Sequence, residues 1–247
     1  MPPGPWRDCQ LDLGSPTALR ALLERERPGI VVFCAYDQTD RAVTVDAPAR
    51  AAAVAARLGA RFVFLSTDLV FDGQTGHYTE TDPPAPLLAY GAMKADAERQ
   101  VRSGHPTAVV VRASLFVGES GVMRRPAYEC ENLARGRPVT LYRDEWRSPT
   151  HVDDVARAVW DLALRDVAGT FHVAGPDRLT RLELGTLLCA LFQLDARLLH
   201  EGPRPPSRPR DTSLDGSRTA ALLGWTPRSI VAFAQRPPAP SAPVAHV

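Results

Sequence analysis

The 247-residue chain has no long hydrophobic run, no paired cysteines and almost no net charge. Because it contains no run of 18 apolar residues, we expect no membrane-spanning helix. The N-terminus reads Met-Pro-Pro-Gly-Pro-Trp-Arg and lacks the apolar core of a signal peptide, which argues against export. The formal net charge of +1 gives no electrostatic reason to expect nucleic acid or an anionic membrane as a partner. These absences together favour a cytoplasmic protein.

Metal and disulfide sites are also poorly supported. The four cysteines lie far apart and form no C-x-x-C pair: Cys9, Cys34, Cys130 and Cys189. We expect them to be small buried apolar side chains in a reducing compartment. His151, Asp153 and Asp154 resemble a ligand cluster, but carboxylates in a first helical turn also interact favourably with the helix dipole. We therefore interpret residues 151–154 as a helix start and expect no metal.

Apolar runs alternate with helical patterns in the first half of the chain. Short continuous apolar runs, typical of strands buried on both faces of a parallel sheet, lie at residues 30–34, 61–65 and 108–111. Helical patterns lie at residues 15–28, 41–58 and 90–101, and Ser15-Pro16 is suited to begin the first of them. Right-handed crossovers between such strands predict an α/β fold with a doubly wound, Rossmann-type parallel sheet.

The pattern loosens in the second half. We expect helices near 124–135, 152–165 and 180–191, and short strands at 139–141, 170–173 and 197–200. We interpret residues 8–120 as a dinucleotide-binding domain and residues 121–235 as mainly a small C-terminal α/β substrate-binding lobe. Residues 236–247 are rich in proline and alanine without apolar periodicity, so we expect a disordered tail.

Candidate catalytic residues follow the second predicted strand and open the next helix. Tyr90 and Lys94 are spaced i, i+4 and therefore lie on one face of that helix. A nearby ammonium favours the phenolate and lowers a tyrosine pKa that is about 10 when unperturbed. Such a tyrosine can exchange a proton with a carbonyl or alcohol, and a hydroxyl from Ser66 or Thr67 can bind the same oxygen. Tyr and Lys four apart also occur on many solvated helix surfaces.

Four segments together are more specific than this pair. They read S-T-D-L-V-F-D-G at 66–73, Y-G-A-M-K-A-D-A-E at 90–98, V-R-A-S-L-F-V-G at 111–118 and R-S-P-T-H-V-D-D-V-A at 147–156. In this order they resemble dTDP-4-dehydrorhamnose reductases and their relatives in the extended short-chain dehydrogenase/reductase superfamily. The resemblance covers residues 10–235.

The resemblance implies NAD(P)H-dependent reduction of a 4-keto sugar nucleotide. It implies Thr67, Tyr90 and Lys94 as the catalytic residues, with Tyr90 giving a proton to the C4 oxygen. It implies NADP or NAD as the cofactor, bound by Ser66, Tyr90, Lys94, Ala35 and Tyr36. Related dehydratases carry glutamate two residues after the catalytic threonine, where this chain has a leucine, so reduction is favoured over dehydration.

Substrate contacts are expected from Asp68, Leu115 and Arg208. Arg208 belongs to a segment similar to the family's R-P-x-x-S-x-L-D, and its guanidinium is suited to an anionic diphosphate. A solvated loop charge is the alternative for Arg208. Leu115 stands where rhamnose-forming relatives usually have tryptophan, which puts the rhamnose precursor in doubt as the substrate.

The chain departs from the family at its N-terminus. The expected G-x-x-G-x-x-G turn, which brings backbone close to a pyrophosphate, is not in the sequence. Residues 10–13 resemble the end of the family's third strand, so we expect an N-terminally truncated sheet that exposes residues 30–34 as an apolar edge. Three explanations of the missing N-terminal segment remain open. They are a start codon that is assigned too late, a gene that has decayed, and an exposed edge that binds a partner.

Two functions therefore stay open. The first is the reductase, which we expect to be inactive in the chain as printed because the phosphate-binding turn is missing. The second is a non-catalytic regulatory or binding subunit with a reductase fold, like the β subunit of methionine adenosyltransferase. The oligomeric state, a homodimer or a complex with a partner subunit, is left open.

Overall fold

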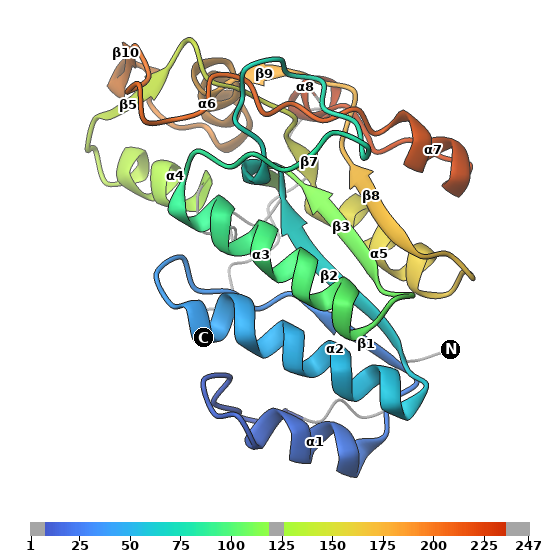
Figure 1. Cartoon of the computed structure of the whole chain (residues 1–247). Helices are drawn as coiled ribbons and strands as arrows, with labels where there is room; N and C mark the ends of the chain where they lie inside the picture. Colours follow the sequence, from blue (N-terminus) through green and yellow to red (C-terminus); the bar gives the residue numbers. More distant parts are fainter. Residues whose placement is uncertain (1–7, 119–125, 236–247) are drawn as a thin grey trace.

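Four strands form one parallel sheet in the order β1-β2-β3-β8 (Figure 1). Their bounds are Ile30–Phe33 (β1), Arg61–Thr67 (β2), Val109–Ala113 (β3) and Gly169–Val173 (β8). This computed structural model describes residues 8–118 and 126–235. The inner strands β2 and β3 are almost wholly buried, which explains why their sequences are continuous apolar runs. The predicted α/β fold with a Rossmann-type parallel sheet is confirmed.

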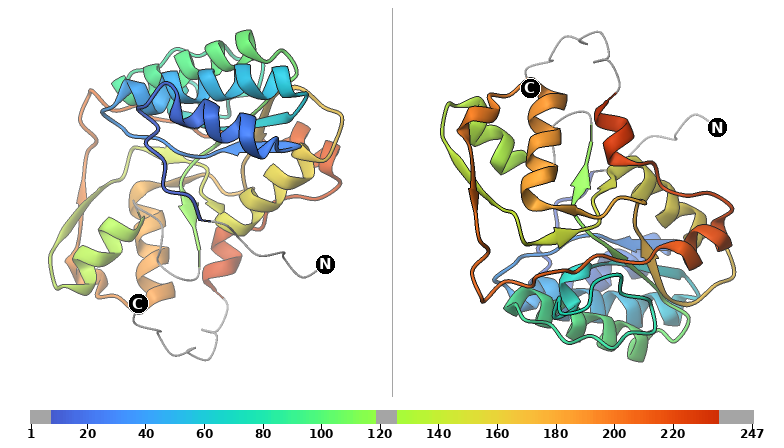
Figure 2. Two further views of the ribbon diagram at one scale, coloured as in Figure 1. Left: turned by 90° about the horizontal axis from the view of Figure 1, so that it is seen from below. Right: turned by 90° about the horizontal axis from the view of Figure 1, so that it is seen from above.

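Helices cover both faces of the sheet, as Figure 2 shows. One face carries α1 (Ala18–Glu26), α2 (Ala47–Leu58) and α3 (Ala89–Gly104), and the other carries α5 (Val152–Ala163) and α7 (Ser217–Leu223). Side chains alternate between the two faces along each strand. On β2, Phe64 joins the core beneath α1 to α3, while its neighbour Val63 joins the core beneath α5. The sheet is therefore doubly wound.

The fourth strand corrects the predicted division of the chain. Residues 170–173 were expected in the C-terminal lobe, but β8 pairs with β3 along its whole length, from Val109↔Gly169 to Ala113↔Val173. α5, which precedes β8, packs on β2 and β3 of the same sheet. A single boundary at residue 120 therefore does not separate sheet from lobe, because the chain returns to the sheet after residue 150.

A smaller lobe lies beyond the carboxyl ends of the strands. Its helices and strands are β4 (Phe116–Val117), α4 (Pro126–Ala134), β5 (Val139–Tyr142), β6 (Trp146–Arg147), β7 (Thr150–His151), β9 (Leu179–Thr180), α6 (Arg181–Phe192), β10 (Leu199–Gly202) and α8 (Ile230–Ala234). β5 and β10 form a parallel pair. A separate apolar cluster of α6, α8 and the segment after β3 fills its core, including Leu184, Leu188 and Phe233.

β1 is an edge of the sheet in the described part of the chain. It pairs with β2 from Ile30↔Arg61 to Phe33↔Phe64, and no described strand pairs with its other side. Ile30, Val31 and Val32 are only half-buried there. The apolar edge predicted at residues 30–34 is thus present among the described residues, with the strand ending at Phe33.

Two other expectations for the N-terminal region were wrong: the strand end at residues 10–13 and the start of the first helix at Ser15. Residues 10–13 form no strand; Leu11 and Leu13 pack instead against the core beneath α1 to α3. The first helix begins at Ala18 with Thr17 at its N-cap, and Ser15 Oγ accepts a hydrogen bond from the Ala18 amide. The helix expected at 41–58 is present without a break: its π-helical segment Ala42–Asp46 runs directly into α2.

The cysteines do not share one environment. Cys9 and Cys34 are exposed, Cys130 is half-buried and Cys189 is buried. The expectation of four buried thiols therefore holds for Cys189 alone.

The predicted tail at 236–247 lies outside the described residues. Within the described ranges no helix is long and apolar enough to cross a membrane.

Candidate active site

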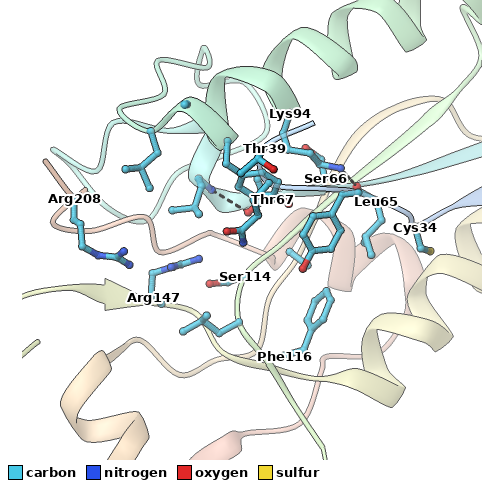
Figure 3. A pocket seen from close by; sticks show the side chains of 18 residues that line it. Cys34, Thr39, Leu65, Ser66, Thr67, Lys94, Ser114, Phe116, Arg147 and Arg208 are labelled. Atoms are coloured by element: carbon cyan, nitrogen blue, oxygen red, sulfur yellow. Dashed lines mark hydrogen bonds between the residues drawn. The ribbon is translucent and has the colours of Figure 1, made fainter. Parts of the chain in front are cut away.

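The carboxyl ends of β1, β2 and β3 open into a pocket of about 420 Å³ beneath the lobe. Figure 3 shows its side chains, with Cys34 and Lys94 toward one end, Arg147 and Arg208 at the other, and Thr67 and Ser114 between them. Parallel α/β sheets bind ligands outside the carboxyl ends of their strands, so this is the expected place for chemistry. Eighteen residues line it: Cys34, Tyr36, Gln38, Thr39, Leu65, Ser66, Thr67, Leu69, Leu88, Ala89, Tyr90, Lys94, Ala113, Ser114, Leu115, Phe116, Arg147 and Arg208.

Most of the predicted site residues meet in this pocket. Ser66 and Thr67 come from the end of β2, and Tyr90 and Lys94 come from the first two turns of α3. The helix places Tyr90 and Lys94 on one face because they are four residues apart. The remaining three predicted residues in the lining are Tyr36, Leu115 and Arg208.

Tyr36 and Tyr90 pack together at the β1 end of the pocket. Their ring centroids are 5.5 Å apart and the rings are tilted by 48°. Tyr36 is 41% exposed, so it forms part of the pocket's rim. Ala35, which was expected to contact the cofactor, is exposed and is not among the lining residues.

Lys94 is the chain's only lysine, and every other basic side chain apart from the histidines is an arginine. Its side chain is almost completely buried: its amine donates a hydrogen bond to the Leu65 carbonyl oxygen (2.6 Å) and lies 4.0 Å from the centroid of the Phe64 ring. Burial lowers the pKa of Lys94 to about 7, and Glu98 and Cys34 act against this effect. Lys94 can therefore change its charge near neutral pH.

Thr67 presents its hydroxyl beside this lysine-bearing helix. Its Oγ1 donates to Asp68 Oδ1 (3.1 Å) and accepts from the Leu69 amide (3.3 Å). The second bond caps the short 3-10 turn Asp68–Val70 that follows β2. The strand end and the turn thus fix the position of the hydroxyl.

Asp68 has a different position from the one expected. It has no exposed surface and is absent from the pocket lining, so it is not placed to contact a substrate. Its carboxylate accepts two hydrogen bonds from Arg147, at 2.5 and 2.6 Å. Ser114 and Thr212 also donate to it, at 2.6 and 2.9 Å. Asp68 therefore ties β2, β3 and the lobe together directly behind Thr67.

A chain of charges continues from this carboxylate to the far end of the pocket. Arg147 Nη1 lies 3.6 Å from Glu145, and Arg208 binds the same carboxylate at 2.6 and 2.8 Å. Burial alone would raise the pKa of Glu145, but Arg208 and Arg147 hold it below its ordinary value. The Arg208 guanidinium reaches the pocket while its position is set by Glu145.

Among the lining residues that had not been assigned individually are Ser114, Phe116 and Arg147. Ser114 and Phe116 directly follow β3, in a segment already singled out by its motif. Arg147 is the first residue of another such motif, 147–156. Nothing in that motif indicates that Arg147 binds Asp68 at the end of β2. Leu115 lines the pocket, yet it is mainly buried among the apolar residues of the lobe.

The residues of the pocket's β1 end fit the nicotinamide half of a dinucleotide. A buried amine, a tyrosine and the strand-end hydroxyl of Ser66 line that end, and an aromatic ring, that of Tyr36, forms the rim. A nicotinamide ribose offers hydroxyls to such donors, and its ring needs an apolar wall. Tyr36, Ser66, Tyr90 and Lys94 are the residues that would hold this half.

Comparison with known proteins decides the family. The family of the RmlD substrate binding domain matches residues 4–234, nearly the whole chain. The chain belongs to the RmlD family. The resemblance identified from the four motifs is thereby confirmed.

Curated relatives of this RmlD-family chain include two proteins named as reductases and a subunit of methionine adenosyltransferase. It is 33% identical to the probable low-salt glycan biosynthesis reductase Agl14 of Haloferax volcanii, over 89% of this chain and 81% of that protein. It is 34% identical to a probable dTDP-4,6-dihydroxy-2-methyloxan-3-one 4-ketoreductase of Streptomyces antibioticus, over 87% of this chain and 80% of that protein. It is 31% identical to methionine adenosyltransferase 2 subunit beta of Pongo abelii, over 86% and 70%.

Solved structures of dTDP-4-dehydrorhamnose reductases have the same fold. The dTDP-4-dehydrorhamnose reductase of Bacillus anthracis, in complex with NADP, superposes with a TM-score of 0.79 over 91% of this chain and 85% of that one, at 22% identity. The corresponding reductase of Clostridium acetobutylicum gives a TM-score of 0.77 over 87% and 81%, at 25% identity.

Proposed function

We propose that this chain forms the active site of an NAD(P)H-dependent reductase acting on a 4-keto sugar nucleotide. The observation that carries the proposal is the convergence of Thr67, Tyr90 and Lys94 in one pocket with an arginine at its opposite end. Two reductases at 33% and 34% identity support the reaction class. The NADP complex of the Bacillus anthracis reductase supports the cofactor.

Each residue then has a defined task. Bound NAD(P)H supplies a hydride to the C4 carbon of the sugar. Tyr90 gives its phenolic proton to the C4 oxygen, and the Lys94 ammonium stabilises the phenolate that remains. The Thr67 hydroxyl can turn from Asp68 to the C4 oxygen and hold the carbonyl beside Tyr90. The products are a 4-hydroxy sugar nucleotide and the oxidised cofactor.

Arg208 provides the anchor for the rest of the substrate. Its guanidinium reaches the pocket from the lobe, at the end away from Lys94 (Figure 3). A guanidinium forms paired hydrogen bonds with phosphate oxygens, and Glu145 already orients this one. A diphosphate bound there would leave the sugar between Thr67 and Phe116.

The direct test measures NADPH and NADH consumption with a dTDP-4-keto-6-deoxy sugar. It uses the printed chain and a version extended by the in-frame codons upstream of Met1, because the sequence contains no G-x-x-G-x-x-G turn. We expect Tyr90→Phe to lower the rate by about 10²–10⁴-fold, the usual contribution of a positioned proton donor. Tyr142→Phe, outside the pocket lining, is the matched control. Turnover that persists in Tyr90→Phe would reject the role of Tyr90.

A regulatory subunit is the second candidate, supported by the similarity to methionine adenosyltransferase 2 subunit beta. The open edge of β1 offers a surface on which such a subunit could pair with another chain. Size-exclusion chromatography with a methionine adenosyltransferase catalytic subunit tests it. A stoichiometric complex, together with no turnover in either version of the chain, would favour this candidate over the reductase.

A further inference from the structure

Glu98 is a fully buried carboxylate that lies one helical turn beyond Lys94 on α3. Residues 90, 94 and 98 are spaced by four, so Tyr90, Lys94 and Glu98 follow one another along a single face of the helix. Tyr90 and Lys94 line the pocket, whereas Glu98 does not. It therefore has no direct access to a bound substrate.

The Glu98 carboxylate is held by three side chains. Arg112 on β3 binds both of its oxygens, with Nε 2.9 Å from Oε1 and Nη2 2.7 Å from Oε2. Ser66 on β2 donates its hydroxyl to Oε1 at 2.6 Å, and Arg102 on α3 lies 3.5 Å from Oε2. These contacts hold the carboxylate in one place and compensate its loss of water, because a buried charged group needs ion-pair and hydrogen-bond partners. They also join α3 to both inner strands of the sheet.

Lys94 needs such a neighbour. Its amine has the Leu65 carbonyl and the Phe64 ring as described contacts, and neither carries a negative charge. An opposite charge within one helical turn stabilises a buried ammonium against the loss of water. Glu98 is the carboxylate that acts on Lys94 in this way.

We propose that Glu98 is a positioning residue: it holds the Lys94 ammonium and the Ser66 hydroxyl in place beside Tyr90, across the junction of α3 and β2. Its part in catalysis rests on the proposed reductase function, but its effect on Lys94 does not. The groups that face Lys94 are Tyr90 and Glu98 on α3 and Cys34 after β1.

Other charged groups approach Glu98 from its far side. Arg112 on β3 and Arg102 on α3 are its partners, and His172 on β8 lies 3.5 Å from the Arg112 guanidinium. Among these groups, Glu98 is the one that acts on the charge of Lys94. Removing the Glu98 charge should therefore lower the fraction of Lys94 that is protonated at a given pH.

The single lysine makes this measurable without a substrate. Labelling with lysine enriched in ¹³C at Cε gives one side-chain resonance for Lys94, whose shift reports its protonation as pH is varied. We expect Glu98→Gln to raise the acid dissociation constant of the Lys94 ammonium about tenfold or more, so that its titration midpoint moves to lower pH. This is the usual effect of losing a close opposite charge. Glu98→Asp, which keeps the charge, should restore most of the wild-type value. A purely structural role would leave the titration midpoint unmoved.

Glu98→Gln leaves Arg112 buried without its partner and could unfold the chain. The double variant Glu98→Gln/Arg112→Gln removes both charges, and we expect the Lys94 midpoint to fall in it as well, because Glu98 is the nearer group. An unchanged midpoint in either folded variant overturns the proposal. So does unfolding of both variants while Glu98→Asp folds, since Glu98 would then be needed for the fold alone. Failure of the reductase assay would reject the proposed function and leave this result standing.

Discussion

Arg147 and Asp68 form a bidentate ion pair with almost no exposed surface, at 2.5 and 2.6 Å, between the lobe and the end of β2. Thr67 immediately precedes Asp68, and its hydroxyl donates a hydrogen bond to the Asp68 carboxylate. The pair therefore connects the wall of the lobe to the hydroxyl that is proposed to hold the substrate carbonyl. It explains how a lobe built from short, separate strands stays fixed over the sheet.

Breaking this pair should destabilise the fold. We expect Asp68→Asn to lower the free energy of unfolding by about 3–5 kcal/mol, because the buried Arg147 guanidinium loses its main counter-charge. Urea denaturation measures the change. Asp166→Asn is the matched control: the Asp166 side chain is fully exposed and lies 3.8 Å from Arg61, so we expect a change below about 0.5 kcal/mol. Equal effects in the two variants would contradict the structural role given to Asp68.

Gly91 sets how closely α3 approaches the turn after β2. A Cβ at this position would lie 2.0 Å from the Leu69 carbonyl oxygen, which is backbone and cannot easily move. Although alanine normally favours a helix, we expect Gly91→Ala to cost about 1–3 kcal/mol and to displace Tyr90. Gly29→Ala is the control, since a Cβ there meets nothing within 4 Å. Thermal unfolding of both variants measures the difference in stability. A Gly91→Ala variant as stable as the wild type would show that α3 and the turn after β2 are not in such close contact.

The parts of the fold that were predicted well carry their signal in the local sequence. β2, α3 and β3 are buried apolar runs or amphipathic patterns, and their bounds follow from burial. The position of β8 could not be predicted in this way. Its sequence, Gly-Thr-Phe-His-Val, is short and polar, and it belongs to the sheet because of a pairing with β3 some 60 residues earlier.

In the candidate active site, too, local sequence signals could be interpreted and long-range contacts could not. Tyr90 and Lys94 are brought together by helical spacing, and Thr67 by the end of a strand, so the sequence could predict that all three line one pocket. Asp68 was expected to contact the substrate, but the chain turns there and the Asp68 side chain binds Arg147. Contacts of this kind join residues nearly 80 positions apart and leave no local pattern.

Stability should depend on pH through Lys94. Its pKa is about 7 in the folded chain and about 10.4 when unfolded, so between these values the unfolded chain binds more protons. The free energy of unfolding therefore rises with pH across this window, by at most about 1.4 kcal/mol per pH unit from this group. Lys94→Met removes the effect, and the difference between wild type and variant in urea denaturation isolates it. A difference that stays constant from pH 7 to 10 would contradict the lowered pKa.

Arg208 should govern substrate affinity more than the chemical step, because it lies at the end of the pocket away from Lys94. A hydrogen bond from a charged group contributes about 1.5–3 kcal/mol, so we expect Arg208→Gln to raise the KM for the sugar nucleotide about 10–150-fold. The kcat should change much less, since Tyr90, Lys94 and Thr67 are untouched. Arg197→Gln is the control, because that side chain is 90% exposed and pairs with its neighbour Asp195. If Arg208→Gln lowers kcat and leaves KM unchanged, the guanidinium acts on the reacting carbonyl and the diphosphate must bind elsewhere.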